Sequence, residues 1–180
     1  MPGNAEGVDF TIEPVNAYHT AYISVGSNMG ERLENCRRGM AALIRSGRCR
    51  LIDQSCIYKT EPVDYVAQHW FVNYVSKIET TRDPFSLMDL LASIEISAGR
   101  VRDGIRFGPR VLDLDIIFYD DLIVDESRLK IPHPRMHERH FVLKPVCDIS
   151  PEMMHPVFRQ TMQSLLNDLD KTGQGIHKYK

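Results

Sequence analysis

Apolar and polar residues alternate or recur along most of this chain, and their spacing predicts where its helices and strands lie. Ala21, Ile23 and Val25 alternate with other residues, which indicates a strand over residues 21–25. From residue 33 to residue 44 the apolar positions recur every three to four residues, as on one face of a helix. The chain therefore begins its folded part with a strand and a helix.

The boundaries of this helix and the next two strands also follow from residue type. Asn28, with Glu31 three residues later, is typical of a capping box at a helix start, and Gly47 is typical of a helix end. Residues 51–58 and 70–80 are rich in β-branched and aromatic residues, which favours two strands.

A second helix and a fourth strand follow. Asp83 and Pro84 are typical of an N-cap and a first helical residue, and Gly99 of the end of the helix. The apolar residues between these boundaries recur at helical spacing, and residues 111–119 alternate as in a strand.

The order strand, helix, strand, strand, helix, strand predicts an α+β fold. It is the order of the ferredoxin-like βαββαβ core, an antiparallel sheet with helices on one face. A short extra strand near residues 123–124 and a C-terminal helix after Thr161 would follow this core. We expect residues 1–19 to be a loosely ordered extension and residues 20–175 to form a single domain.

Composition narrows the class of partner. The chain has 180 residues, 43% of them hydrophobic, and a net charge of −2, so it offers no overall attraction to nucleic acid or to an anionic membrane. We expect neither as a partner. Because the sequence shows no basic leader and no long apolar run, we expect a cytoplasmic location. The four cysteines lack metal-site and redox spacings and should be reduced thiols.

Two aspartates stand on the same side of the strand predicted over residues 111–119. Asp113 and Asp115 are about 7 Å apart at Cα, close enough to share two divalent cations. Mg²⁺ commonly binds through one or two carboxylates plus substrate phosphates. The opposite side of the strand should carry the apolar residues Leu112, Leu114, Ile116 and Phe118. The sequence therefore predicts a site for two Mg²⁺ ions on one strand face.

Arginines precede these aspartates, and a polyphosphate is the ligand that they suit best. No G-x-x-x-x-G-K-[ST] motif is present, so the chain is not a P-loop kinase. Phe71 and Asn73 share a strand face on which a flat heterocycle could stack, although ordinary strand packing explains them better on residue type alone. The arginines are Arg100, Arg102, Arg106 and Arg110.

Three histidines raise the alternative of a zinc site. Prolines on both sides of His133 interrupt any helix there, and no fourth ligand is spaced to close a site with His137 and His140. We therefore interpret His133 as a hydrogen-bond donor to phosphate.

Six short motifs stand in a fixed order along the chain. They are Gly26-Ser27-Asn28, Tyr58-Lys59-Thr60, Phe71 with Asn73, Gly99-Arg100-Val101-Arg102, the run G-P-R-V-L-D-L-D from Gly108 to Asp115, and Ile131-Pro132-His133. Together they resemble the 6-hydroxymethyl-7,8-dihydropterin pyrophosphokinase family over roughly residues 21–149. The resemblance implies an enzyme of folate biosynthesis that transfers a diphosphoryl group from ATP to the hydroxymethyl oxygen of 6-hydroxymethyl-7,8-dihydropterin and releases AMP. It also implies two Mg²⁺ ions, and other folate-pathway enzymes as partners.

The resemblance also implies individual roles. The catalytic arginines would be Arg100 and Arg110, and the metal ligands Asp113 and Asp115. The residues that contact ATP would be Glu95, Arg102, Ile116, Arg128, Lys130, His133 and Arg139. The pterin pocket would comprise Thr60, Val63, Phe71, Asn73, Phe107 and Phe141. The chain departs from residues common in the family at Glu61, Ala92, Phe107 and Pro134.

Two other functions fit the same order of elements. One is a catalytically silent ferredoxin-like module that senses a nucleotide, and the other is an RNA-binding sheet of the RRM type. The first is disfavoured because both aspartates and both catalytic-type arginines are present. The second lacks the aromatic RNP signature.

Overall fold

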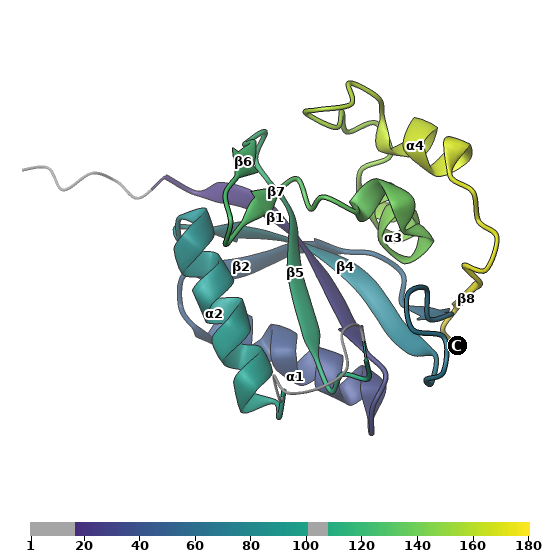
Figure 1. Cartoon of the computed structure of the whole chain (residues 1–180). Helices are drawn as coiled ribbons and strands as arrows, with labels where there is room; N and C mark the ends of the chain where they lie inside the picture. Colours follow the sequence, from purple (N-terminus) through teal and green to yellow (C-terminus); the bar gives the residue numbers. More distant parts are fainter. Residues whose placement is uncertain (1–16, 101–107) are drawn as a thin grey trace, which may run out of the picture.

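The main sheet of the fold is antiparallel and has helices on both faces (Figure 1), and a separate two-stranded sheet lies beside it in the described part of the chain. The computed structural model describes residues 17–100 and 108–180. In chain order its elements are β1 His19–Ser27, α1 Arg32–Arg45, β2 Cys49–Gln54, β3 Tyr58–Thr60, β4 Phe71–Thr80, α2 Pro84–Ser97, β5 Asp113–Tyr119, β6 Val124–Asp125, β7 Lys130–Ile131, a 3-10 helix Met136–Glu138, α3 His140–Ile149, α4 Met162–Asp168 and β8 Ile176–Lys178.

The main sheet has the strand order β5-β1-β4-β3-β8, and β2 also pairs with β4. The first four elements of this order are those of a ferredoxin-like sheet, so the predicted α+β fold is confirmed. The strand predicted over residues 51–58 is two strands, however. Strand β2 ends before Ser55, whose backbone N–H still donates to the Val75 carbonyl at 3.0 Å but whose Oγ accepts the hydrogen bond of 3.0 Å from the Val75 N–H.

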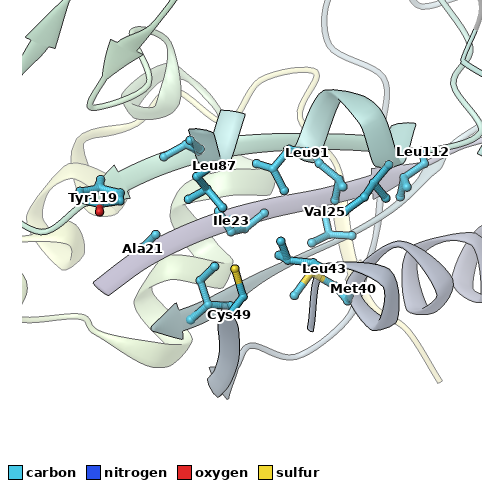
Figure 2. Close-up of a cluster of buried hydrophobic side chains, with 14 of the residues drawn as sticks. Ala21, Ile23, Val25, Met40, Leu43, Cys49, Leu87, Leu91, Leu112 and Tyr119 are labelled. Carbon is cyan, nitrogen blue, oxygen red and sulfur yellow. The ribbon is translucent and has the colours of Figure 1, made fainter. Parts of the chain in front are cut away.

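Helices α1 and α2 cover one face of the sheet, where the larger apolar cluster lies (Figure 2). Ala21, Ile23 and Val25 of β1 are fully buried there against Leu43 of α1 and Leu87 of α2, which confirms the predicted alternation of β1. The N-cap of α2 is also confirmed, because the Asp83 carboxylate accepts hydrogen bonds from the backbone N–H groups of the helix's first turn.

The predicted alternation along β5 fails at Phe118. The pairing of β5 with β1 shifts between Tyr22 and Ile23, so that Ile117 is an extra residue in the ladder. Phe118 is thereby turned to the opposite face, where its ring meets the Tyr22 ring edge-on at 6.0 Å between centroids. Ile116, before the shift, stays on the predicted face.

The opposite face of the sheet is covered by α3 and α4, whereas the sequence predicted helices on one face only. Val142 and Val146 of α3 and Leu166 of α4 pack there beside Val75 of β4. The predicted C-terminal helix is confirmed as α4, with the Thr161 hydroxyl accepting from the Ser164 N–H at 3.1 Å. Helix α3 was not predicted, because it is short and contains a proline. No helix in the described part of the chain is long and apolar enough to cross a membrane.

His155 gives the fold a testable pH dependence. Its ring is buried between Phe118 and Phe158, and Nδ1 accepts hydrogen bonds from two backbone N–H groups. Burial, with the nearby His137, lowers the pKa of His155 from 6.5 to about 4. The unfolded chain therefore binds this proton more readily, and the stability that is present above pH 6.5 is lost as the pH falls towards 4.

We expect His155→Asn, which cannot titrate but keeps a side-chain acceptor, to remove part of this acid sensitivity. Between pH 7.5 and pH 4.5 the variant should lose less unfolding free energy than the wild-type chain, by on the order of 2 kcal/mol. Urea denaturation at both pH values measures the difference. Equal losses would show that His155 is not the group responsible.

Candidate active site

A cavity of about 260 Å³ opens on the sheet face that carries α3. Its walls come from the ends of β1, β4 and β5, the loop after β3, and the start of α3. Five of the six residues predicted for a pterin line it, and Phe107 lies outside the described residues. The five are Thr60, Val63, Phe71, Asn73 and Phe141. Predicted metal, arginine and phosphate residues line the same cavity, namely Asp113, Asp115, Arg110, His133 and Arg139.

Strand register explains why these groups meet. Gly26 of β1 pairs with Asn73 of β4 on one side and with Asp113 of β5 on the other. A Cβ atom on Gly26 would lie 2.4 Å from Asn73 Oδ1, so only glycine leaves room for the amide to lie across β1. Two pairs further along, Ser24 is opposite Asp115. The amide and the two carboxylates therefore occupy one face of three adjacent strands.

Asn73 is fixed from the side of β3. Its Nδ2 donates to the Thr60 hydroxyl at 2.6 Å, and both residues are buried. Phe71, two residues before Asn73 in β4, pairs with Thr60 and lines the same cavity. An aromatic ring and an oriented amide thus stand side by side at this end of the cavity.

Asn28 lies at the edge of this site and does not cap α1 as predicted. The structure places Glu31 at the N-cap without a side-chain hydrogen bond. The Asn28 Oδ1 instead accepts from the Arg110 N–H at 2.7 Å, and its Nδ2 donates to Gln68 Oε1 at 2.8 Å. Asn28 therefore links the backbone of Arg110 to Gln68 in the loop after β3. Its buried amide makes these two contacts and does not cap α1.

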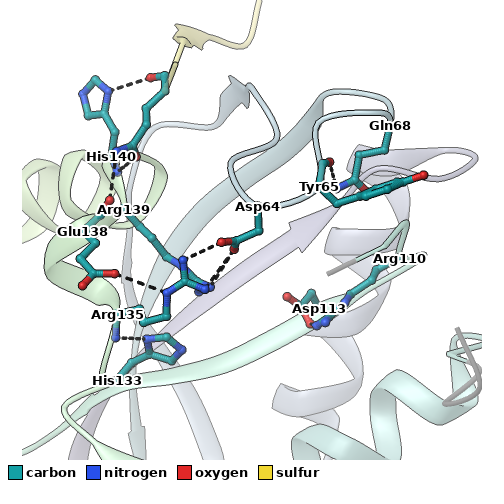
Figure 3. A network of polar contacts seen from close by, with 11 residues as sticks. Asp64, Tyr65, Gln68, Arg110, Asp113, His133, Arg135, Glu138, Arg139 and His140 are labelled. Atoms are coloured by element: carbon teal, nitrogen blue, oxygen red, sulfur yellow. Dashed lines mark hydrogen bonds and ion pairs between the residues drawn. The ribbon is translucent and has the colours of Figure 1, made fainter. Parts of the chain in front are cut away.

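The two predicted catalytic arginines converge on Asp113 from the two ends of segment 101–107. Arg110 forms an ion pair with Asp113 (Figure 3), and Arg100 lies 3.6 Å from the same carboxylate. Arg100 also pairs with Glu95, whose other oxygen accepts from the Leu114 N–H at 2.8 Å. Arg102 and Arg106 lie outside the described residues.

Glu95 is almost fully buried and lines neither of the two cavities described here. Burial raises its pKa. Its contacts with Arg100 and with the Leu114 N–H hold Arg100 beside the start of β5. Its predicted contact with ATP stays a prediction.

Asp115 is the most perturbed carboxyl group of the site. Burial raises its pKa to about 7, and the negative charges of Asp113 and Glu95 act in the same direction. Such a cluster of carboxylates is stabilised by added cations. No group of three or more His, Cys, Asp or Glu side chains that could hold a metal was found among the described residues. The donor set fits Mg²⁺ bound by two carboxylates and completed by phosphate and water oxygens.

A second cavity of about 300 Å³ meets the first at Asp115 and His133. Four residues predicted to contact ATP line it, namely Ile116, Arg128, Lys130 and His133. Arg128 forms an exposed ion pair with Asp89 at 2.8 Å. Burial, together with Arg139 and Arg135, lowers the pKa of His133 to about 4, so its imidazole is neutral at pH 7.

Asp64 was missed by the sequence analysis. Its carboxylate accepts two hydrogen bonds from Arg135, at 2.6 and 3.2 Å, and lies 3.5 Å from Arg139 (Figure 3). This network joins the loop after β3 to the segment before α3. No local pattern marks Asp64, because its partners are about seventy residues away in sequence. Ser24 and Gly26 were also missed, although their alternation with Ile23 and Val25 would have placed them on the other strand face.

Comparison with known proteins connects this geometry to a family. The family model of 7,8-dihydro-6-hydroxymethylpterin-pyrophosphokinase (HPPK) matches residues 22–151. The chain is 40% identical over 135 residues to a 2-amino-4-hydroxy-6-hydroxymethyldihydropteridine pyrophosphokinase of Pseudomonas aeruginosa, covering 75% of this chain and 83% of that protein. It is 40% identical over 159 residues to a folic acid synthesis protein of Schizosaccharomyces pombe, covering 88% of this chain but 21% of that longer protein.

Solved structures agree with the fold. A Plasmodium falciparum HPPK-DHPS structure with pteroate superposes with a TM-score of 0.67 at 16% identity, covering 84% of this chain and 42% of that chain. The present chain thus spans less than half of that protein and about a fifth of the yeast relative. Because the family model covers most of the chain and includes the whole strand that bears Asp113 and Asp115, the chain belongs to the 7,8-dihydro-6-hydroxymethylpterin-pyrophosphokinase family.

Proposed function

We propose that this chain transfers the β,γ-diphosphoryl group of ATP to the hydroxymethyl oxygen of 6-hydroxymethyl-7,8-dihydropterin, releasing AMP, as a step of folate biosynthesis. The observation that carries the proposal is the junction of the two cavities. One cavity presents an aromatic ring and an amide, the other presents basic side chains, and Asp115 and His133 line both. A phosphoryl donor bound in the second cavity and a phosphoryl acceptor bound in the first would meet at the carboxylates.

The first cavity suits the pterin. Phe71 and Phe141 offer rings on which a flat heterocycle can stack, and Asn73 offers an amide already oriented by Thr60. An apolar ligand of the same shape would leave polar groups of the buried Asn73 amide unpaired. The cavity therefore favours a heterocycle with hydrogen-bond donors and acceptors along its edges.

The second cavity suits the nucleotide. Arg128 and Lys130 supply positive charge, and Ile116 supplies an apolar contact for the base. Arg139 reaches the first cavity, with its guanidinium 5.5 Å from the centre of the Phe141 ring, where it can meet the phosphates. The triphosphate would then pass from the basic cavity across Asp115.

The reaction needs positioning and charge neutralisation more than proton transfer. The pterin hydroxymethyl oxygen bonds to the β-phosphorus, the bond from that phosphorus to the α-bridging oxygen breaks, and the hydroxyl proton leaves to solvent. Asp113 and Asp115 would hold two Mg²⁺ ions, which neutralise the triphosphate and align its phosphates. Arg110 and Arg100, paired with Asp113 in the structure, would turn to the transferring group when that carboxylate holds Mg²⁺ instead of the arginines.

Pterin-dependent turnover of ATP tests the proposal. With Mg²⁺ present, the chain should consume ATP rapidly when 6-hydroxymethyl-7,8-dihydropterin is added and negligibly without it. A nucleotide-sensing module would bind ATP and give no turnover in either case.

We expect Asn73→Ala to weaken pterin binding roughly tenfold or more, because the oriented amide is lost, and to change ATP binding less than about twofold. Calorimetric titration of each ligand separately measures both affinities. The control is Asn167→Ala, because Asn167 forms an exposed contact with Gln163 in α4, away from both cavities. Equal losses for both ligands in Asn73→Ala would mean that this strand face is structural.

The remaining sequence-based expectations stay predictions. They include a single domain over residues 20–175, a cytoplasmic location and contact with other folate-pathway enzymes. Residues 1–16 of the predicted extension lie outside the described part of the chain.

A further inference from the structure

The C-terminal strand β8 lies against the part of the sheet that carries the predicted pterin residues. It pairs antiparallel with β3, placing Ile176 opposite Thr60. The pairing continues one residue further at Glu61 and Gly175. The Glu61 N–H donates to the Gly175 carbonyl at 2.8 Å, and the Gly175 N–H donates to Glu61 Oε2 at 3.0 Å. Both the backbone and the side chain of Glu61 are therefore bound to a single residue of the C-terminal segment.

The same segment also contacts the opposite wall of the cavity. The Gln174 Oε1 accepts from the His140 N–H at 2.8 Å, and its Nε2 donates to the Glu138 carbonyl at 3.0 Å. His140 lies between Arg139 and Phe141, which both line the cavity. Gln174 and Gly175 thus bridge the loop after β3 and the start of α3.

Gly175 has little room for a side chain. A Cβ atom on Gly175 would lie 3.1 Å from Glu61 Oε2 and 3.1 Å from Trp70 Cη2. The Trp70 ring stacks on His177 of β8 at 5.6 Å between centroids, with the planes 13° apart. Trp70 immediately precedes Phe71, the first residue of β4, so the segment packs against β3 and against the residue before β4.

We propose that the C-terminal segment 174–178 sets the separation of the two walls of the pterin cavity, and that Glu61 is the positioning residue that fastens this segment to the wall containing Thr60. The inference rests on the proposed function for the identity of the ligand. Glu61 also lines the cavity, and it holds Gly175 beside Thr60. Its loss should therefore change how well the pterin fits and leave the phosphate-transfer groups in place. Exchange of the Gly175 amide separates this positioning role from a direct contact with the pterin.

The test compares Glu61→Ala with Glu61→Gln, whose amide oxygen can still accept from the Gly175 N–H. Glu61→Ala should raise KM for the pterin roughly tenfold, with KM for ATP and kcat changed less than about twofold. Glu61→Gln should restore the pterin KM to within about threefold of the wild-type value. Hydrogen exchange should show faster exchange of the Gly175 amide in Glu61→Ala.

Gln174→Ala tests the other end of the bridge. It should also raise the pterin KM selectively, because the contact with the start of α3 is lost. The matched controls are Glu152→Ala, at an exposed carboxylate after α3, and Gln163→Ala, at a half-buried residue of α4 whose amide contacts the exposed Asn167; neither should change a kinetic constant.

The outcomes separate the two proposals. A wild-type chain without pterin-dependent turnover would contradict the proposed function. With an active wild-type chain, an unchanged pterin KM in Glu61→Ala, or equal changes for both substrates together with a lower kcat, would overturn the bridge. A selective rise in pterin KM that Glu61→Gln reverses supports it.

Discussion

Asp115→Ala is expected to reduce turnover by at least about 10³-fold and to abolish Mg²⁺-dependent binding of an ATP analogue. The fold should persist, because the substitution removes a half-buried carboxylate whose pKa is already raised to about 7 by desolvation and by its acidic neighbours. AMP release, calorimetry with and without Mg²⁺, and thermal unfolding measure the three effects. Asp113→Ala should behave in the same way.

The matched control is Asp121→Ala, because Asp121 is exposed in the turn that follows β5 and lines neither cavity. It should retain wild-type activity. Near-normal turnover of Asp115→Ala at saturating Mg²⁺ would rule out this carboxylate as a metal ligand.

Arg110→Ala is expected to lower kcat by about 10²-fold or more while changing ATP affinity much less. The reason is that Arg110 pairs with Asp113 in the structure and would reach the diphosphoryl group only in the productive complex. Single-turnover rates and ATP titration separate the two effects.

Arg128→Ala provides the contrasting result. Its side chain lines the nucleotide cavity, so ATP affinity should fall while the chemical step is retained. Arg38→Ala, at an exposed residue of α1 paired with Glu34, should change neither quantity. If Arg110→Ala lost only ATP affinity, Arg110 would belong to the binding surface and not to the transfer step.

Much of the fold follows from local sequence. The positions of β1, α1, β4 and α2 are set by apolar spacing and by residues such as Asp83 that act within one helical turn. The face to which Phe118 points could not be predicted, because it depends on a register shift against Tyr22 almost a hundred residues earlier. The edge strand β8 has three residues, too few for a periodic pattern, and exists through its pairing with β3.

The candidate site also has residues that local sequence could place and residues that depend on the tertiary structure. Asp113 and Asp115 could be placed together because two residues of one strand share a face whatever the tertiary structure. Bringing Asn73 beside Asp113 requires the register of three strands and the missing Cβ of Gly26. The capping role predicted for Asn28 was wrong, because its amide makes tertiary contacts that compete successfully with the helix start.

The identity of the nucleotide product tests the central claim most directly. Phosphorus NMR of the chain with ATP, Mg²⁺ and 6-hydroxymethyl-7,8-dihydropterin should show AMP and a pterin diphosphate ester forming in equal amounts, with no ADP. In the absence of the pterin, ATP should persist. Formation of ADP, or of AMP at the same rate without the pterin, would contradict diphosphoryl transfer at the junction of the two cavities.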